Sequence, residues 1–135
     1  MPNVKKHLEK AKSNREFLNH IGDTENTRYP EWYVIVSFYI AMHYLEAVLC
    51  EKCALHAKSH EQRSEYLRTR LRGKLDHEVI LAYDALQIQS RHARYEAPEN
   101  NNEILKQYCR DAQKNLEIIE TECKNDYLHS YLGFF

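Results

Sequence analysis

The sequence predicts an all-α fold, an antiparallel bundle of four long helices and one short helix. Apolar residues recur at helical spacing in five segments, and no segment alternates polar and apolar residues as a strand does. The chain holds only 3 Gly and 3 Pro in 135 residues, too few for the many tight turns of a β-rich fold. This length suits one domain, over residues 1–135, with a core of its own.

The first two helices follow from their end signals and their apolar content. Residues 3–21 carry apolar side chains at helical spacing, and Gly22 ends this helix. The second helix, over residues 30–54, begins with Pro30, which suits the first turn. Its stretch WYVIVSFYIAMHYLEAVL is apolar on all sides, so we expect it in the middle of the bundle.

The third, short helix covers residues 60–72 and is rich in arginine. Ser59 is a suitable N-cap, with Gln62 three residues later, and Gly73 ends the helix. The fourth helix covers residues 75–96. The fifth begins near Asn100, where Asn100-x-x-Glu103 resembles a capping box, and it carries a regular apolar repeat that ends at Cys123.

Two regions predict contacts that a single four-helix core does not explain. The fourth helix has two apolar stripes, which need contacts on two sides, within the bundle or across a subunit boundary. The C-terminal tail, YLHSYLGFF, has too many apolar groups for a free end, so we expect it to pack back on the bundle or to cover a partner subunit. Both regions leave a contact with a second subunit open, as in a homodimer.

Charge and cysteine usage limit the partners and the compartment. The formal net charge of −1 gives no overall basic field, so nucleic-acid binding must come from a local patch. The N-terminus MPNVKKHLEK is charged and helical, unlike a signal peptide, and four free thiols suit the cytoplasm. A membrane span in the second helix is disfavoured because His43 and Glu46 lie inside its apolar stretch.

Three polar clusters are candidates for a site. On the second helix, Tyr39, His43, Glu46 and Cys50 lie within a stripe about 60° wide. Burial of the His and the Glu is costly without partners, and we expect Arg94 to reach Glu46. This stripe is either a structural ion-pair network or the floor of a polar pocket.

The other two clusters are Ser59-His60-x-x-Arg63 and Ser90-Arg91-His92-Ala93-Arg94-Tyr95. Each has a structural interpretation, a helix cap followed by surface charge for the first, and cations at a helix C-terminus for the second. In the functional interpretation, Arg63, Arg91 and Arg94 bind phosphate and Tyr95 stacks on a base or contacts a second subunit.

Taken in order, FYxAxHYxEAxL (residues 38–49), SHxxR (59–63) and SRxARY (90–95) resemble the HEPN superfamily, named for higher eukaryotes and prokaryotes nucleotide-binding. The resemblance covers about residues 8–119. It implies a compact and frequently dimeric helical bundle, often encoded beside a nucleotidyltransferase or in a toxin–antitoxin or defence system. It also implies a metal-independent ribonuclease with an Arg-x(4–6)-His motif near the end of the fourth helix.

This chain departs from that motif, because no His follows Arg91 or Arg94 at the required spacing. Without an imidazole there, no general base is available to activate a ribose 2′-hydroxyl. We therefore expect binding of nucleotide or RNA phosphate, without an assigned catalytic residue or cofactor. The expected ligand-binding residues are His43, Glu46, His60, Arg63, Arg91, Arg94 and Tyr95.

Two further classes stay open. One is a non-catalytic interaction module, such as the partner of a nucleotidyltransferase, whose polar clusters are structural ion pairs. The other is a metal-dependent helical-bundle enzyme that uses His43, Glu46 and His60. Cys50, Cys53, His56 and His60 also offer four zinc ligands within eleven residues, although a helix that includes both cysteines makes tetrahedral closure awkward.

Overall fold

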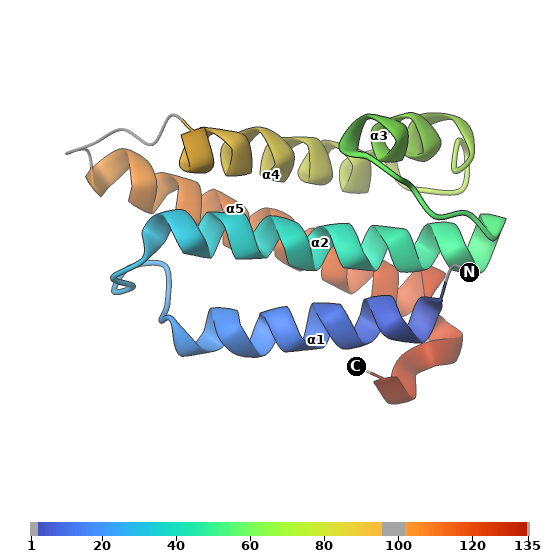
Figure 1. The fold of residues 1–135 in the computed structure, drawn as a ribbon, viewed down its shortest axis with the longest axis horizontal. Coiled ribbons are helices and arrows are strands. Elements are labelled where there is room, and N and C mark those ends of the chain that lie inside the picture. Colours follow the sequence, from blue (N-terminus) through green and yellow to red (C-terminus); the bar gives the residue numbers. More distant parts are fainter. Residues whose placement is uncertain (1–2, 96–101, 135) are drawn as a thin grey trace.

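The computed structural model describes residues 3–95 and 102–134, and these residues form helices and their connections (Figure 1). No strand occurs within these two ranges. The five α-helices are α1 (Val4–His20), α2 (Pro30–Cys53), α3 (His60–Thr69), α4 (His77–Tyr95) and α5 (Asn102–Glu122). A π-helical turn, η1 (Cys123–Tyr127), and a 3₁₀ segment, η2 (His129–Phe134), follow. The expected all-α fold is confirmed.

Helix α2 lies in the middle of the bundle, as its all-round apolar sequence predicts. It contacts α1, α4, α5 and the short α3. In Figure 1 the long helices α1, α2, α4 and α5 alternate in direction along the chain, and α3 lies beside the first turns of α4. The connection between α2 and α3 returns from the C-terminal end of α2, and it brings the start of α3 over that half of the central helix.

The length and apolar content of α2 also meet the requirements for crossing a membrane. Most of its apolar stretch is nevertheless buried against other helices of the bundle, and the core helix of a soluble protein passes the same test. Its buried Ser37 is satisfied within the helix, because the hydroxyl donates to the carbonyl of Tyr33 at 2.7 Å.

Several helix ends differ by a few residues from the expected ones. The α2 helix ends at Cys53, because Ala54 takes the left-handed conformation with φ 53° and caps the helix. The α3 helix ends at Thr69 rather than residue 72, because the N–H groups of Arg70 and Leu71 both donate to the carbonyl of Tyr66. The expected cap at Asn100 and the end of the fourth helix at residue 96 lie outside the described residues.

The two stripes of α4 have different environments. The first stripe is buried in the bundle at Leu75, Val79, Ala82, Leu86 and Ala93. On the second stripe, Leu81 and Ile88 are 55% and 54% exposed. The apolar repeat of the fifth helix is buried throughout, as expected, at Leu105, Cys109, Ala112, Leu116, Ile119 and Cys123.

The C-terminal tail packs back on the bundle, which was one of its two expected arrangements. Leu128 is fully buried. The hydroxyl of Tyr127 accepts from the backbone N–H of Asp76 at 2.9 Å, and the hydroxyl of Tyr131 donates to Glu51 at 2.8 Å. These two hydrogen bonds attach the tail to the last turn of α2, at Glu51, and to the residue before α4, Asp76. Residues 127–131 are therefore packed against the helical bundle.

Candidate functional site

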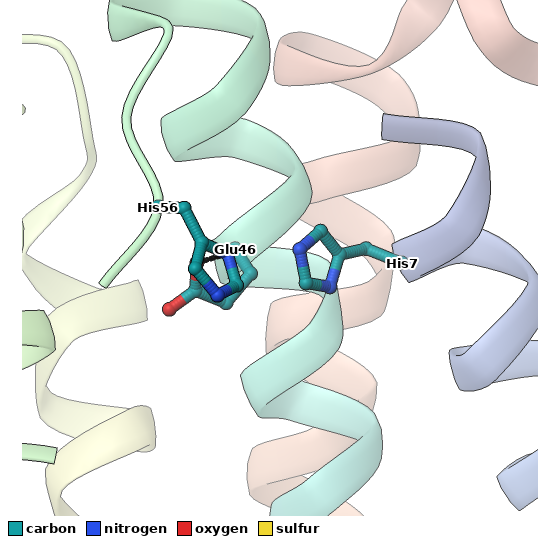
Figure 2. A group of neighbouring side chains, drawn as sticks. All are labelled: His7, Glu46 and His56. Carbon is teal, nitrogen blue, oxygen red and sulfur yellow. Dashed lines mark ion pairs between the residues drawn. The ribbon is translucent and has the colours of Figure 1, made fainter. Parts of the chain in front are cut away.

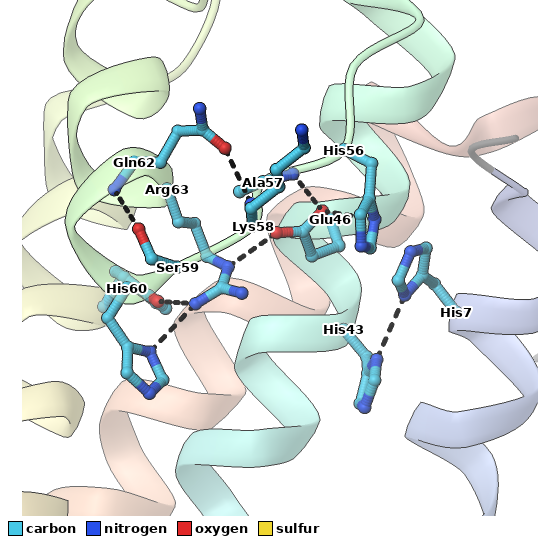
Figure 3. A network of polar contacts seen from close by, with 11 residues as sticks. His7, His43, Glu46, His56, Ala57, Lys58, Ser59, His60, Gln62 and Arg63 are labelled. Carbon is cyan, nitrogen blue, oxygen red and sulfur yellow. Dashed lines mark hydrogen bonds and ion pairs between the residues drawn. The ribbon is translucent and has the colours of Figure 1, made fainter.

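The candidate site centres on a buried ion pair between α2 and α3 (Figure 3). Glu46 is 1% exposed and Arg63 is 6% exposed. The Nε of Arg63 donates to Oε1 of Glu46 at 2.7 Å. A buried carboxylate needs such a partner, since desolvation of an unpaired charge costs several kcal/mol, on the order of 3–5 when one partner of a buried pair is removed.

The expected pairing of Glu46 with Arg94 is therefore wrong. Arg94 lies near the C-terminal end of α4, where its Nη1 donates to the hydroxyl of Tyr39 at 3.1 Å. Tyr39 precedes Glu46 by two helical turns, which is about 10 Å along the helix axis. Arg63 is closer because the Ser59 cap, which accepts from the N–H of Gln62, starts α3 directly over Glu46.

The second oxygen of Glu46 holds the connection between α2 and α3. Its Oε2 accepts from the backbone N–H of Ala57 at 3.3 Å, and Nδ1 of His56 lies at the same distance, 3.3 Å. Ala57 is buried and His56 is exposed, so Oε2 faces a region that solvent reaches through the His56 side chain. The two carboxylate oxygens of Glu46 thus have different partners: Oε1 contacts Arg63 of α3, and Oε2 contacts the connection between α2 and α3.

On the α3–α4 side, His60 and three arginines form what we call the arginine face: His60, Arg63, Arg91 and Arg94. The Nη1 of Arg63 donates to Nδ1 of His60 at 3.0 Å, and it lies 3.4 Å from the hydroxyl of Tyr83. Burial lowers the pKa of His60 below 6.5, and the charges of Arg63, Arg94 and Arg91 lower it further. The structure therefore gathers these four predicted site residues, with Glu46 joined to them through Arg63 and Tyr95 through Arg94.

The protonation of His60 follows from its neighbour. A guanidinium only donates, so Nδ1 of His60 accepts and the neutral ring carries its proton on Nε2. The lowered pKa of His60 agrees with this neutral form at pH 7. Its Nε2–H is then a donor on the outer side of the arginine face. Three guanidinium groups and one imidazole donor make this region suited to an anion.

A hollow of about 740 Å³ opens beside His60 and Arg91. Ser59, Ser64 and Gln87 line it with further polar groups, and Glu61 contributes one carboxylate. Its lining residues come from α3 and α4 and the Ser59 cap, so both helices determine its shape.

Arg94 and Tyr95 extend the arginine face toward the end of α4. The guanidinium carbon of Arg94 lies 5.5 Å from the ring centre of Tyr95, which is 76% exposed. The Nε of Arg94 is buried without a hydrogen-bond partner. Arg91 is exposed, as its position away from the main apolar stripe predicts. Arg63, in contrast, is buried, so it orients His60 and Glu46 rather than reaching a large ligand itself.

On the α1 side of Glu46 lies a second group, the imidazole cluster of His7, His43 and His56. The Nδ1 atoms of His7 and His43 are 3.1 Å apart, so one ring donates to the other. The rings of His7 and His56 stack with their centres 5.3 Å apart. Burial is the first cause of a lowered pKa at both His7 and His43, and the pKa of His43 falls to about 4.

His43 and His60, which were both expected to line one pocket, have different partners in the structure: His43 contacts His7 of α1, and His60 contacts Arg63 of α3. No sequence motif singles out His7. The sequence indicates only that His7 lies at the edge of the apolar stripe of α1, because it comes three residues after Val4 and one before Leu8.

The zinc set that the sequence leaves open is not assembled either. Cys50, Cys53, His56 and His60 do not form a metal-ligating group among the described residues, nor do His43, Glu46 and His60. The Sγ of Cys53 faces the carbonyl of Arg70 at 3.7 Å instead. The structure groups His7, Glu46 and His56, whose donor atoms all lie within 4.8 Å of one another (Figure 2).

The candidate site therefore has two sides, the arginine face and the imidazole cluster, which share the carboxylate of Glu46. A different helix next to α2 supplies each side: α3 supplies Arg63, and α1 supplies His7. No family model, no curated protein and no solved structure matches this chain.

Proposed function

We propose that this protein is a HEPN-like helical bundle that binds the phosphate groups of RNA or nucleotides on its arginine face. The observation that supports this function best is the position of Arg63, Arg94 and Arg91 around one neutral imidazole, His60. Guanidinium groups bind phosphate oxygens through two parallel hydrogen bonds, and the exposed ring of Tyr95 offers a surface on which a base stacks.

Each residue has a distinct part in this proposal. Arg91 and Arg94 contact phosphate, and the Nε2–H of His60 donates to the same group or to its neighbour. Arg63 fixes the tautomer of His60 through the 3.0 Å contact to Nδ1, and Glu46 holds Arg63 in place. The bound ligand lies over the hollow between α3 and α4, where serine hydroxyls supply further donors.

The proposal is binding without an assigned reaction. A general base needs a free lone pair, but Arg63 donates to Nδ1 of His60 and the other ring nitrogen carries the proton. His60 therefore serves as a donor in this arrangement. We place the protein in the cytoplasm, and we extend the proposal to a homodimer through the exposed α4 stripe with Leu81 and Ile88.

A second candidate function is an interaction module, such as the partner of a nucleotidyltransferase in a toxin–antitoxin or regulatory pair. An exposed aromatic patch favours it. Phe17, Tyr29 and Trp32 are about half exposed and, with His20 and Ile21, line a hollow of about 390 Å³ where α1 meets α2. Exposed aromatic side chains of this kind are enriched in protein interfaces.

The test of RNA binding is the affinity for a labelled single-stranded oligoribonucleotide at several salt concentrations, with ATP as a competitor. We expect Arg91→Ala/Arg94→Ala to weaken binding by about tenfold or more at low salt. We also expect the slope of log K against log salt to fall by about 1.4, or about 0.7 for each lost phosphate contact.

The matched control is Arg70→Ala/Arg72→Ala, which removes the same charge from two exposed arginines beyond the end of α3. This variant keeps the affinity within about twofold if the arginine face is the binding site. Equal losses in both double variants would show nonspecific attraction. Wild-type affinity in the Arg91→Ala/Arg94→Ala protein, or no measurable RNA or ATP binding by the wild type, overturns the proposal.

A further inference from the structure

We propose that His7, His56 and Glu46 form a binding site for a divalent transition metal ion, with zinc as the best match. The site lies on the opposite side of Glu46 from the arginine face, and it does not depend on RNA or nucleotide binding. His43 orients the ring of His7 through the contact between their Nδ1 atoms.

The donor atoms already converge. One atom from each of the three side chains lies within 4.8 Å of the others, and the three come from α1, α2 and the 54–59 connection. Figure 2 shows His7, Glu46 and His56 gathered beside α2, and the rings of His7 and His56 stack on each other. Donors on one tetrahedral zinc ion, at about 2.0–2.1 Å from the metal, lie roughly 3.3 Å apart. Closure therefore requires the donor atoms to approach one another by at most about 1.5 Å.

The chemistry of the donor set fits zinc. Two imidazoles and one carboxylate are borderline ligands that suit Zn²⁺ and its neighbours in the first transition row better than Mg²⁺ or Ca²⁺. Three protein ligands leave the fourth tetrahedral position to water or to an external ligand. The side chain of His56 is exposed, so an ion can reach the site from solvent.

The surroundings of His7 are those of a metal-binding histidine. Its Nδ1 pairs with Nδ1 of His43 at 3.1 Å, which leaves Nε2 as the free ring nitrogen. Ligating histidines typically donate their second N–H to an acceptor, and this fixes the ring orientation. The Nδ1 of His43, at 3.1 Å, is in position to be that acceptor.

The two oxygens of Glu46 have different roles in this proposal: Oε1 holds Arg63, and Oε2 binds the metal ion. Oε1 is committed to Arg63 at 2.7 Å, whereas Oε2 has only long contacts of 3.3 Å to Ala57 N and His56 Nδ1. A cation on Oε2 repels the nearby guanidinium across one shared carboxylate. We therefore expect an affinity well below that of a closed structural zinc site, and easy removal by chelators.

The experiment is a titration of the full-length, chelator-treated protein with Co²⁺, followed in the visible absorption spectrum, and then displacement of Co²⁺ by Zn²⁺. We expect one ion for each chain, with intense d–d bands typical of a tetrahedral site. His7→Ala and His56→Ala should each weaken Co²⁺ binding by more than about tenfold, and His43→Phe by about tenfold. His20→Ala is the matched control, an exposed histidine on the same helix as His7.

Three results would overturn the metal site. The first is a wild-type protein that binds no Co²⁺ or Zn²⁺. The second is unchanged affinity in both His7→Ala and His56→Ala. The third is thiolate-to-cobalt charge transfer in the near ultraviolet, which places the ion on cysteine. Far-ultraviolet circular dichroism shows that each variant is folded, and thermal stabilisation of the wild type by Zn²⁺ gives a second readout.

The Arg91→Ala/Arg94→Ala protein separates the two proposals. It loses RNA affinity if the arginine face binds phosphate, yet it should bind Co²⁺ as the wild type does, because neither arginine contacts the three ligands. Loss of both properties together would mean that the two sites are not distinct.

Discussion

The two sides of Glu46 differ in how their charge is set. On the arginine face, the guanidinium groups are charged at every pH at which the protein is folded. In the imidazole cluster, burial keeps His7 and His43 neutral at pH 7, so their charge depends on the solution. Oε1 of Glu46 thus contacts a side chain that is always charged, Arg63, whereas Oε2 contacts an imidazole, His56.

This difference indicates that the arginine side of Glu46 stabilises the fold, whereas the imidazole side responds to pH and to ligands. The Glu46–Arg63 pair is buried and has further contacts to His60 and Tyr83, so it is part of the scaffold. The imidazole cluster has an exposed member, His56, and a carboxylate oxygen with only long contacts. A ligand or a proton therefore alters the second side at a lower energetic cost than the first.

The largest effect is expected from breaking the ion pair. Arg63→Met leaves the Glu46 carboxylate buried without its cation, and we expect the free energy of unfolding to fall by about 3–5 kcal/mol. Urea unfolding at pH 7.5, followed by circular dichroism, measures this loss.

The control is the double variant Glu46→Leu/Arg63→Met, in which neither charge remains. We expect it to recover at least half of the loss, because replacing a buried pair by apolar groups is often neutral. A loss below about 1 kcal/mol in Arg63→Met would show that the pair is worth no more than a surface ion pair.

The second effect is a pH dependence that belongs to the imidazole cluster. The pKa of His43 is about 4 in the folded protein and 6.5 for an ordinary histidine, because of burial and of the nearby His7, Lys10, Arg63 and His56. The unfolded chain therefore binds a proton more readily than the folded one. The contribution of this group to stability is present in full well above pH 6.5 and is lost as the pH falls toward 4, by about 2.5 kcal/mol at pH 4.5.

The measurement is urea unfolding of chelator-treated protein between pH 7.5 and 4.5. We expect His43→Gln to lose most of the difference between the two pH values, since glutamine does not titrate. The same pH dependence in wild type and His43→Gln would contradict the assignment of this effect to His43.

The sequence predicted the fold well because the relevant signals are local. Helical spacing, the Ser59 cap and the glycines at 22 and 73 gave the elements within a few residues, and the all-round apolar content of α2 gave its central position. Arg63 and His60 could be chosen as site residues because SHxxR places them one turn apart at a helix start.

The partners within the site could not be predicted in the same way. Glu46 meets Arg63 because the 54–59 connection folds back over α2, and no periodicity encodes that path. His7 is 36 positions before its partner His43 in the chain, and only the packing of α1 on α2 brings the two rings together. Long-range side-chain pairing thus required the structure, whereas helix identity did not.

The smallest effect concerns the contact between Arg94 and Tyr39, and it tests whether the two sides are independent. Tyr39→Phe removes the acceptor for Arg94 Nη1, so we expect a loss of about 0.5–1.5 kcal/mol in the free energy of unfolding. We also expect RNA affinity to fall by a few fold, because Arg94 loses the contact that holds it toward the arginine face. The pH dependence assigned to His43 should not change, since the hydroxyl that is removed contacts Arg94, whereas the His43 ring pairs with His7. A change in that pH dependence would show that the two sides of α2 are coupled, and that Glu46 transmits charge between them rather than separating them.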